Sequence, residues 1–144
     1  MEASGQVIRV SVGEDPIDTD ALIDEVRRPD SGATVLFLGT VRERSPGKEG
    51  VTHLDYEVFA EQVEPKISEI IAEAVRQWPV LSVVVEHRAG RVDLGDVSVA
   101  VVVSSAHRGD AFAAASFVID ELKTRAPIWK KEHWPGGAEW SQGS

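Results

Sequence analysis

The sequence predicts a mixed α/β protein in which strands and helices alternate along one folded domain. Short segments with alternating or continuous apolar residues are typical of strands, and longer segments with apolar residues every three or four positions are typical of helices. Proline and glycine residues separate these segments. The chain has 144 residues, 42% hydrophobic and 27% charged, which is enough to bury a core. We therefore expect a single domain over residues 1–144.

Seven segments are predicted to be strands: 7–12, 33–38, 51–59, 81–88, 97–103, 128–131 and a short final strand that ends near Trp140. Residues 33–38 are almost wholly apolar, so we expect that strand at the centre of a sheet, covered on both faces. Residues 89–96 contain two glycines and two aspartates and are expected to form a turn.

Three segments are predicted to be helices. The first opens at Asp15-Pro16, with Asp15 as its expected N-cap. The second spans about 61–78 and the third about 110–122. The third helix is expected to turn five residues inward: Phe112, Ala115, Val118, Ile119 and Leu122.

Composition excludes several classes of protein. The formal net charge of −9 argues against a primary role in nucleic-acid binding, which usually needs a basic face. The chain has no cysteine, which excludes a disulfide, a thiolate nucleophile and a Cys-ligated metal. No metal or cofactor site is indicated. The first residues lack the basic and apolar regions of a signal peptide, and we expect a cytoplasmic protein.

The most distinctive segment is 122–132, which places four cations within nine positions of an acidic protein: Lys123, Arg125, Lys130 and Lys131. Pro127 cannot continue a helix, so the helix should end there and lead into a strand. Such a sharp turn would hold Lys123 and Lys130 close together. Two ammonium groups at one pocket suit an anionic substrate, and each tends to lower the other's pKa.

Two other polar segments follow predicted strands. His107 and Arg108 come between a buried strand and a helix start, where backbone N–H groups can bind an anion. Ordinary helix capping explains the same residues equally well. Arg42 precedes a polar loop at 45–50, and by sequence alone a solvated strand end is the favoured interpretation. His87-Arg88 is expected to be a surface pair at a strand end.

The length of the third predicted helix separates His107 and Arg108 from Lys123. A helix from about residue 109 to Lys123 is about 20 Å long at 1.5 Å per residue. His107 and Arg108 therefore cannot reach the same small group as Lys123 within one chain. They serve different sites, or two chains of a symmetric dimer build one site together.

Three segments resemble the large, catalytic subunit of molybdopterin synthase: Phe37-Leu38-Gly39-Thr40-Val41-Arg42, Ser105-Ala106-His107-Arg108 and the segment 122–132. The similarity extends over nearly the whole chain, from the first strand to Trp140. It implies an α/β-hammerhead fold with mostly antiparallel sheets and packed helices.

The resemblance also implies an activity. The family inserts two sulfurs into cyclic pyranopterin monophosphate, which gives the dithiolene of molybdopterin. Sulfur arrives as a thiocarboxylate on the C-terminal Gly-Gly of a small ubiquitin-like subunit, and the complex is a heterotetramer built on a central homodimer of large subunits. No cofactor and no protein-bound metal are implied, because molybdenum joins the product later.

Matched by motif, Lys123 and Lys130 are the expected catalytic residues. The expected substrate-binding residues are Thr40, Val41, Arg42, His107, Arg108, Lys131 and Glu132. The lysines would polarise the acyl group and stabilise negative charge as sulfur is transferred, or one would act as a general acid–base.

Two further functions stay open from the residues alone. A non-catalytic module that docks a ubiquitin-like Gly-Gly tail would keep the groove without needing both lysines. A Schiff-base enzyme would use Lys123 on a carbonyl substrate and would need an apolar pocket around it. RNA binding is disfavoured, since Trp129 is the sole aromatic residue within the basic segment.

Overall fold

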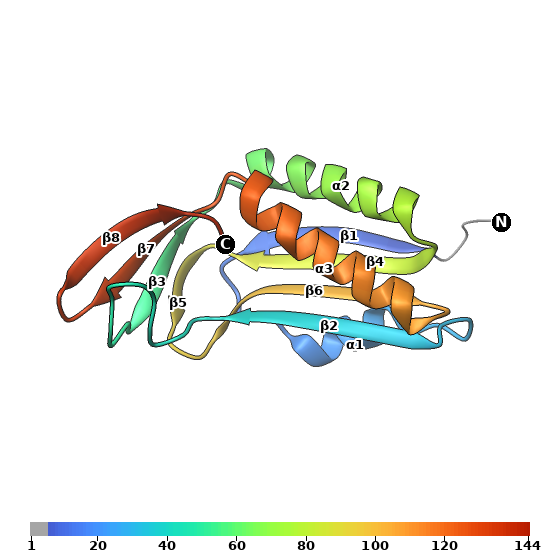
Figure 1. Ribbon diagram of the computed structural model, residues 1–144, viewed down its shortest axis with the longest axis horizontal. Coiled ribbons are helices and arrows are strands. Elements are labelled where there is room, and N and C mark those ends of the chain that lie inside the picture. The colour runs from blue at the N-terminus through green and yellow to red at the C-terminus, as the bar shows by residue number, and fades with distance from the viewer. Residues whose placement is uncertain (1–5) are drawn as a thin grey trace.

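The computed structural model describes residues 6–144, which form two four-stranded sheets and three helices. In chain order the elements are β1 (Val7–Gly13), α1 (Thr19–Glu25), β2 (Ala33–Thr40), β3 (His53–Glu57), α2 (Ala60–Gln77), β4 (Val80–Arg88), β5 (Gly90–Asp93), β6 (Val97–Ser105), α3 (Arg108–Arg125), β7 (Trp129–Trp134) and β8 (Gly137–Gln142). One sheet has the order β1-β4-β6-β2 and the other β5-β3-β7-β8 (Figure 1). Only β1 and β4 pair in parallel among the described strands. The predicted mixed α/β class with mostly antiparallel sheets is confirmed.

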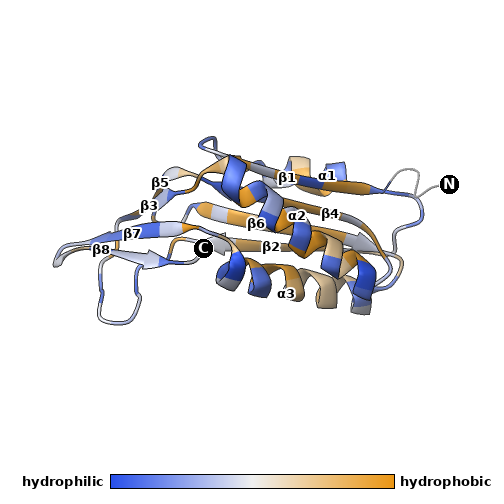
Figure 2. Ribbon diagram, turned by 90° about the horizontal axis from the view of Figure 1, so that it is seen from above, coloured by the Kyte–Doolittle hydropathy of each residue, from blue (hydrophilic) through white to orange (hydrophobic). Residues whose placement is uncertain are grey.

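The first sheet separates two apolar layers. Alternate residues of a strand point to opposite faces, and both faces of β4 and β6 are valine-rich and buried. Val83 and Val101 join the larger core beneath α2 and α3, whereas Val84 and Val102 pack with Leu22 of α1 on the other face. Figure 2 shows this apolar colouring along the central strands, with hydrophilic colouring on β7. The first sheet is therefore the middle layer of an α/β/α arrangement, with α2 and α3 on one face and the shorter α1 on the other.

Helix α3 packs closely on the sheet because its inward positions carry small side chains. Ala111, Ala114 and Ala115 are buried, and Val118 follows at helical spacing. Phe112 was expected to point inward, and that prediction is wrong: its side chain is 61% exposed. The inward face follows the alanines, so Phe112 falls one position away from it.

The predicted position of the strand at 33–38 is also wrong. Among the described strands, β2 pairs with β6 alone, so it lies at the edge of the first sheet. The strand is apolar because both of its faces are covered. Val35 and Phe37 pack on the larger core, and Leu36 packs on the smaller one. A run of apolar residues indicates that both faces of a strand are covered. It does not show whether the strand lies at the edge or at the centre of its sheet.

Two local expectations need correction as well. The segment 89–96 was expected to be a turn, but it contains β5, which pairs with β3. Helix α1 begins later than Asp15-Pro16 suggested. Its N-cap is Asp18, whose side chain accepts a hydrogen bond from the Ala21 N–H at 3.1 Å.

The second sheet extends away from the first one and has two different faces. Leu54 and Tyr56 of β3 and Glu132 of β7 are buried on the inner face. The intervening residues, among them His53 and His133, lie on the opposite, outer face. No helix within residues 6–144 is long and apolar enough to span a membrane.

Candidate functional site

A cavity of about 500 Å³ lies where the two sheets meet. Its described lining comes from six parts of the chain: the end of β2 and the loop after it, β3, the start of β6, the end of α3, β7 and the C-terminal residues. The lining residues are Phe37, Gly39, Thr40, Val41, Arg42, Ser45, Pro46, Lys48, Leu54, Tyr56, Ser98, Val99, Lys123, Lys130, Glu132, Ser141, Gln142 and Ser144. The cavity thus gathers residues up to 107 positions apart, Phe37 and Ser144 being the extremes.

The end of β2 departs from regular strand pairing and is held in place by separate backbone hydrogen bonds. The register with β6 shifts between Gly39 and Thr40. Val41 then leaves the sheet and exchanges two backbone hydrogen bonds with the turn before β6, from its N–H to Asp96 O at 3.0 Å and from Gly95 N–H to its carbonyl at 2.8 Å. Because Val41 is 3% exposed and anchored, the next residue, Arg42, is aimed at the cavity.

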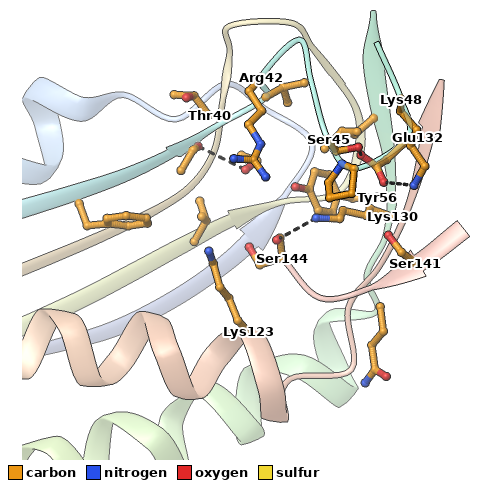
Figure 3. Close-up of a pocket in the computed structure, with 18 residues that line it drawn as sticks. Thr40, Arg42, Ser45, Lys48, Tyr56, Lys123, Lys130, Glu132, Ser141 and Ser144 are labelled. Carbon is orange, nitrogen blue, oxygen red and sulfur yellow. Dashed lines mark hydrogen bonds and ion pairs between the residues drawn. The ribbon is translucent and has the colours of Figure 1, made fainter. Parts of the chain in front are cut away.

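The turn between α3 and β7 places the two lysines at one cavity, as the position of Pro127 predicts. The helix closes with a hydrogen bond from Ala126 N–H to Leu122 O at 3.1 Å, and Ala126 itself is extended. Figure 3 shows Lys123 from α3, Lys130 from β7 and Arg42 from the segment after β2 pointing toward the same space. Three cations from three elements therefore share one cavity.

Lys130 is the more deeply placed of the two lysines. Burial lowers its pKa below the ordinary value, and the nearby positive charges of Lys123, Arg42 and Lys48 lower it further, while Glu132 opposes the shift. Its ammonium donates a hydrogen bond to the backbone oxygen of Ser144 at 3.3 Å. An amine with a lowered pKa can donate and accept a proton more readily near neutral pH.

Glu132 is the anionic counterpart of this cluster. It accepts hydrogen bonds from Ser45 Oγ at 2.9 Å and from Lys48 Nζ at 2.8 Å. Burial raises the pKa of its carboxyl, but these hydrogen bonds and the charges of Lys48 and Lys130 outweigh burial and hold the pKa below its ordinary value. Lys48 also pairs with Glu139 at 2.6 Å. The loop after β2 is thereby tied to β7.

His87 was expected at the surface, and that prediction is wrong, since it is 2% exposed. Its Nδ1–H donates to the Arg88 carbonyl at 2.7 Å, so Nε2 is the acceptor toward the Ser144 hydroxyl at 2.8 Å. The ring meets Tyr56 edge-on, with ring centroids 5.0 Å apart. Burial lowers the pKa of His87 to about 4. The alternation of β4 could have located it, because His87 is in phase with the buried Val83 and Val85.

The structure does not bring every expected residue to the cavity. Thr40, Val41, Arg42, Lys123, Lys130 and Glu132 line it, together with Lys48, which sequence reasoning missed. Lys131 lies on the opposite face of β7, with its ammonium 5.9 Å from the centre of the Trp140 ring.

Arg125 and the residues at the start of α3 also lie away from the cavity. Arg125 instead joins α3 to α2 through Glu73, at 2.6 Å. His107 and Arg108 are exposed at the start of α3, about 22 Å from Lys123 at the rise of an α-helix.

The cavity can bind anions, but its lining does not suit a metal. Four of its residues carry a positive charge: Arg42, Lys48, Lys123 and Lys130. Glu132 carries the sole side-chain carboxylate among the described lining residues, and both its oxygens are engaged by Ser45 and Lys48. Such a site can hold a phosphate and stabilise negative charge that develops during acyl or sulfur transfer.

The chain is similar to several known proteins of one family. The family model described as "MoaE protein" matches residues 12–125. A molybdopterin synthase catalytic subunit from Halalkalibacterium halodurans is 40% identical over 92% of this chain and 84% of the relative. The structure of molybdopterin synthase from Staphylococcus aureus is similar, with a TM-score of 0.84 and 34% identity, covering 90% of this chain and 94% of the other. A molybdopterin biosynthesis MoaE protein from Burkholderia ambifaria has a TM-score of 0.81 and 37% identity, covering 95% and 90%.

Proposed function

The chain belongs to the MoaE protein family, and from that premise we propose that it is the sulfur-transferring, catalytic subunit of a molybdopterin synthase. Its substrate would be cyclic pyranopterin monophosphate and its product the dithiolene of molybdopterin. The observation that carries the proposal is the cavity in which Lys123 and Lys130 converge with Arg42.

The sulfur must come from outside this chain. The sequence has no cysteine, so no persulfide can form on it. A thiocarboxylate at the C-terminal Gly-Gly of a small ubiquitin-like subunit would supply the sulfur. A thiocarboxylate and a cyclic phosphate are both anions, and the cationic lining suits both. The small subunit is therefore the proposed protein partner.

We assign the two lysines complementary roles. Lys123, exposed at the end of α3, would pair with the incoming anion. Lys130, half-buried with a lowered pKa, would stabilise the negative charge that forms as sulfur leaves the acyl carbon, or would shuttle a proton. Arg42 would bind the phosphate, with Thr40 and Val41 beside it. Glu132 would keep the loop after β2 closed against β7 through Lys48.

His107 and Arg108 would complete the site from a second chain. They are too far from Lys123 to act with it in one protomer, as the length of α3 requires. The exposed Phe112 lies one turn beyond them and would be covered in a dimer contact. We propose a symmetric homodimer at the centre of a heterotetramer, in the cytoplasm, with each chain forming one domain.

Subunit mixing tests the shared site. Arg108→Ala and Lys123→Ala chains would each be inactive as homodimers. Each mixed dimer holds one cavity with both native residues, and random mixing makes about half of the dimers mixed. The mixture should therefore recover up to about a quarter of the activity of the same amount of wild-type protein. Failure of the mixture to recover activity, with dimers shown to have exchanged, would refute the shared site.

The proposed activity is tested by direct conversion. Purified protein, the thiocarboxylated small subunit and cyclic pyranopterin monophosphate should give molybdopterin, whereas a small subunit ending in an ordinary carboxylate should give none. Tight binding of the small subunit without any product would favour the alternative of a docking module for a Gly-Gly tail.

A further inference from the structure

The outer face of the second sheet carries a cluster of two histidines and a carboxylate. His53 and Asp55 lie two positions apart on β3 and so share a face. His133 of β7 is the register partner of His53. The cavity residues Tyr56 and Glu132 occupy the inner face of the same strands, so the cluster is separate from the cavity.

The donor atoms of this cluster lie at distances close to those of a metal site. His133 Nε2 is 2.8 Å from Asp55 Oδ2, and His53 Nε2 is 3.8 Å from the same oxygen. One ligand atom from each residue lies within 4.8 Å of the others. Ligands at about 2.0–2.2 Å in a tetrahedral site are about 3.4 Å apart. In distance alone, the donor atoms would need to shift by about 1 Å.

The surroundings of His53 prepare it as a ligand. Its Nδ1 is 2.9 Å from the Thr52 hydroxyl, which leaves Nε2 directed toward Asp55. A metal-binding histidine usually has its other ring nitrogen hydrogen-bonded, which fixes the orientation of the ring.

A simple ion pair does not account for the whole cluster. It explains the contact between His133 and Asp55 at 2.8 Å, but the 3.8 Å between His53 Nε2 and the same oxygen is too long for a hydrogen bond. The two imidazoles stack, with ring centroids 4.2 Å apart and planes 12° from parallel. Binding one ion would need the two rings to rotate about their side-chain bonds from stacked to converging, while the pairing of β3 with β7 is kept.

We propose that His53, Asp55 and His133 bind one divalent transition-metal ion, with Zn²⁺ the best fit to two imidazoles and a carboxylate and with water as the fourth ligand. The ion fastens β3 to β7, the strand that carries Lys130 and Glu132 on its other face. This role is structural and does not depend on the proposed sulfur transfer.

Neighbouring charges set the expected affinity. Arg91 is already paired with Asp93 at 2.7 Å, and Lys131 lies over Trp140. Because both cations remain on the same face, we expect micromolar binding rather than the much tighter binding of four-ligand structural zinc sites.

Calorimetric titration of the chelator-treated full chain with Zn²⁺ tests the proposal. One ion per chain should bind, and Mg²⁺ should not. His53→Ala, His133→Ala and Asp55→Asn should each weaken binding at least about 10-fold. Glu57→Gln is the matched control, because Glu57 is an exposed carboxylate on the same face of β3, and it should bind as wild type does.

Thermal unfolding gives a second readout that does not depend on enzyme activity. Zn²⁺ at about 100 times its Kd should raise the Tm of the wild type by about 5–10 °C and that of the Asp55→Asn chain by much less. If His133→Ala fails to fold, His133→Gln replaces it. Absence of stoichiometric Zn²⁺ binding, or binding that all three substitutions leave unchanged, would overturn the proposal.

Discussion

Replacing Glu132 by glutamine tests whether burial makes the ion pair of this carboxylate important for the stability of the folded protein. The substitution keeps the shape of the side chain but removes the charge that Lys48 and Ser45 contact. The Glu132 and Lys48 side chains are 10% and 12% exposed, so Lys48 would lose a partner that is largely shielded from solvent.

The expected loss of stability can be worked from these contacts. Breaking a fully buried ion pair typically costs about 3–5 kcal/mol. Lys48 keeps Glu139 at 2.6 Å, and glutamine can still accept from Ser45, so we expect about 2 kcal/mol. For a chain of this length, that is a fall in Tm of roughly 5–10 °C.

The pH dependence follows from the sign of the pKa shift. The pKa of Glu132 in the folded protein lies below the ordinary 4.5, so its contribution is complete above about pH 4.5 and is lost as pH falls through the folded pKa. The Tm difference between wild type and Glu132→Gln should therefore be full at pH 7 and should shrink below pH 4.5.

Glu139→Gln is the matched control for this experiment. Glu139 pairs with the same Lys48 ammonium, but its side chain is 61% exposed. Solvent screens exposed pairs, so the control should cost less than half as much as Glu132→Gln. Equal losses in the two variants, measured by thermal and urea unfolding at pH 7, would refute the argument from burial.

Three further predictions concern a glycine of the cavity lining, a buried histidine and the ion pairs between α2 and α3. Gly39→Ala should lower stability by about 1–3 kcal/mol, because an added Cβ would lie 2.6 Å from Val99 Cγ1; urea unfolding measures the loss, and an unchanged midpoint would contradict it. Wild-type stability should fall between pH 6.5 and about 4, by roughly 2–3 kcal/mol at most, because His87 stays neutral when folded while the unfolded chain takes up a proton; His87→Gln should remove that part of the slope, and an unaltered slope would refute the assignment. Arg125→Ala should destabilise the protein without reducing kcat in the folded fraction, since Arg125 contacts Glu73 and Glu121 outside the cavity, and a lower kcat would contradict that placement.

Local patterns were sufficient to predict most elements of the fold. Helix α2 was expected at 61–78 and spans Ala60–Gln77, because its apolar residues recur at helical spacing. Strand β5 was missed since it has four residues beside glycine and aspartate, which resemble a turn locally. Its pairing with β3 is a long-range event that the local sequence does not encode.

Site residues could be predicted where a single segment of the sequence determines their positions. Pro127 forces the turn that places Lys123 and Lys130 at one cavity, so those two could be placed from sequence. Lys48 could not, because its contact with Glu132 joins residues 84 positions apart. Lys131 was included with its neighbours, although the alternation of β7 turns it to the opposite face.

The most direct test of the account compares sulfur transfer by Lys123→Ala and Lys130→Ala with that of wild type. Lys66→Ala serves as the control, because Lys66 is a partly exposed lysine on α2 that pairs with Glu69 outside the cavity. Product formation and affinity for the thiocarboxylated small subunit would be measured on the same preparations. We expect each cavity variant to lose about 10²–10³ in kcat while still binding the small subunit, with Lys66→Ala unchanged. Wild-type rates in either folded cavity variant would contradict the assignment of sulfur transfer to this cavity.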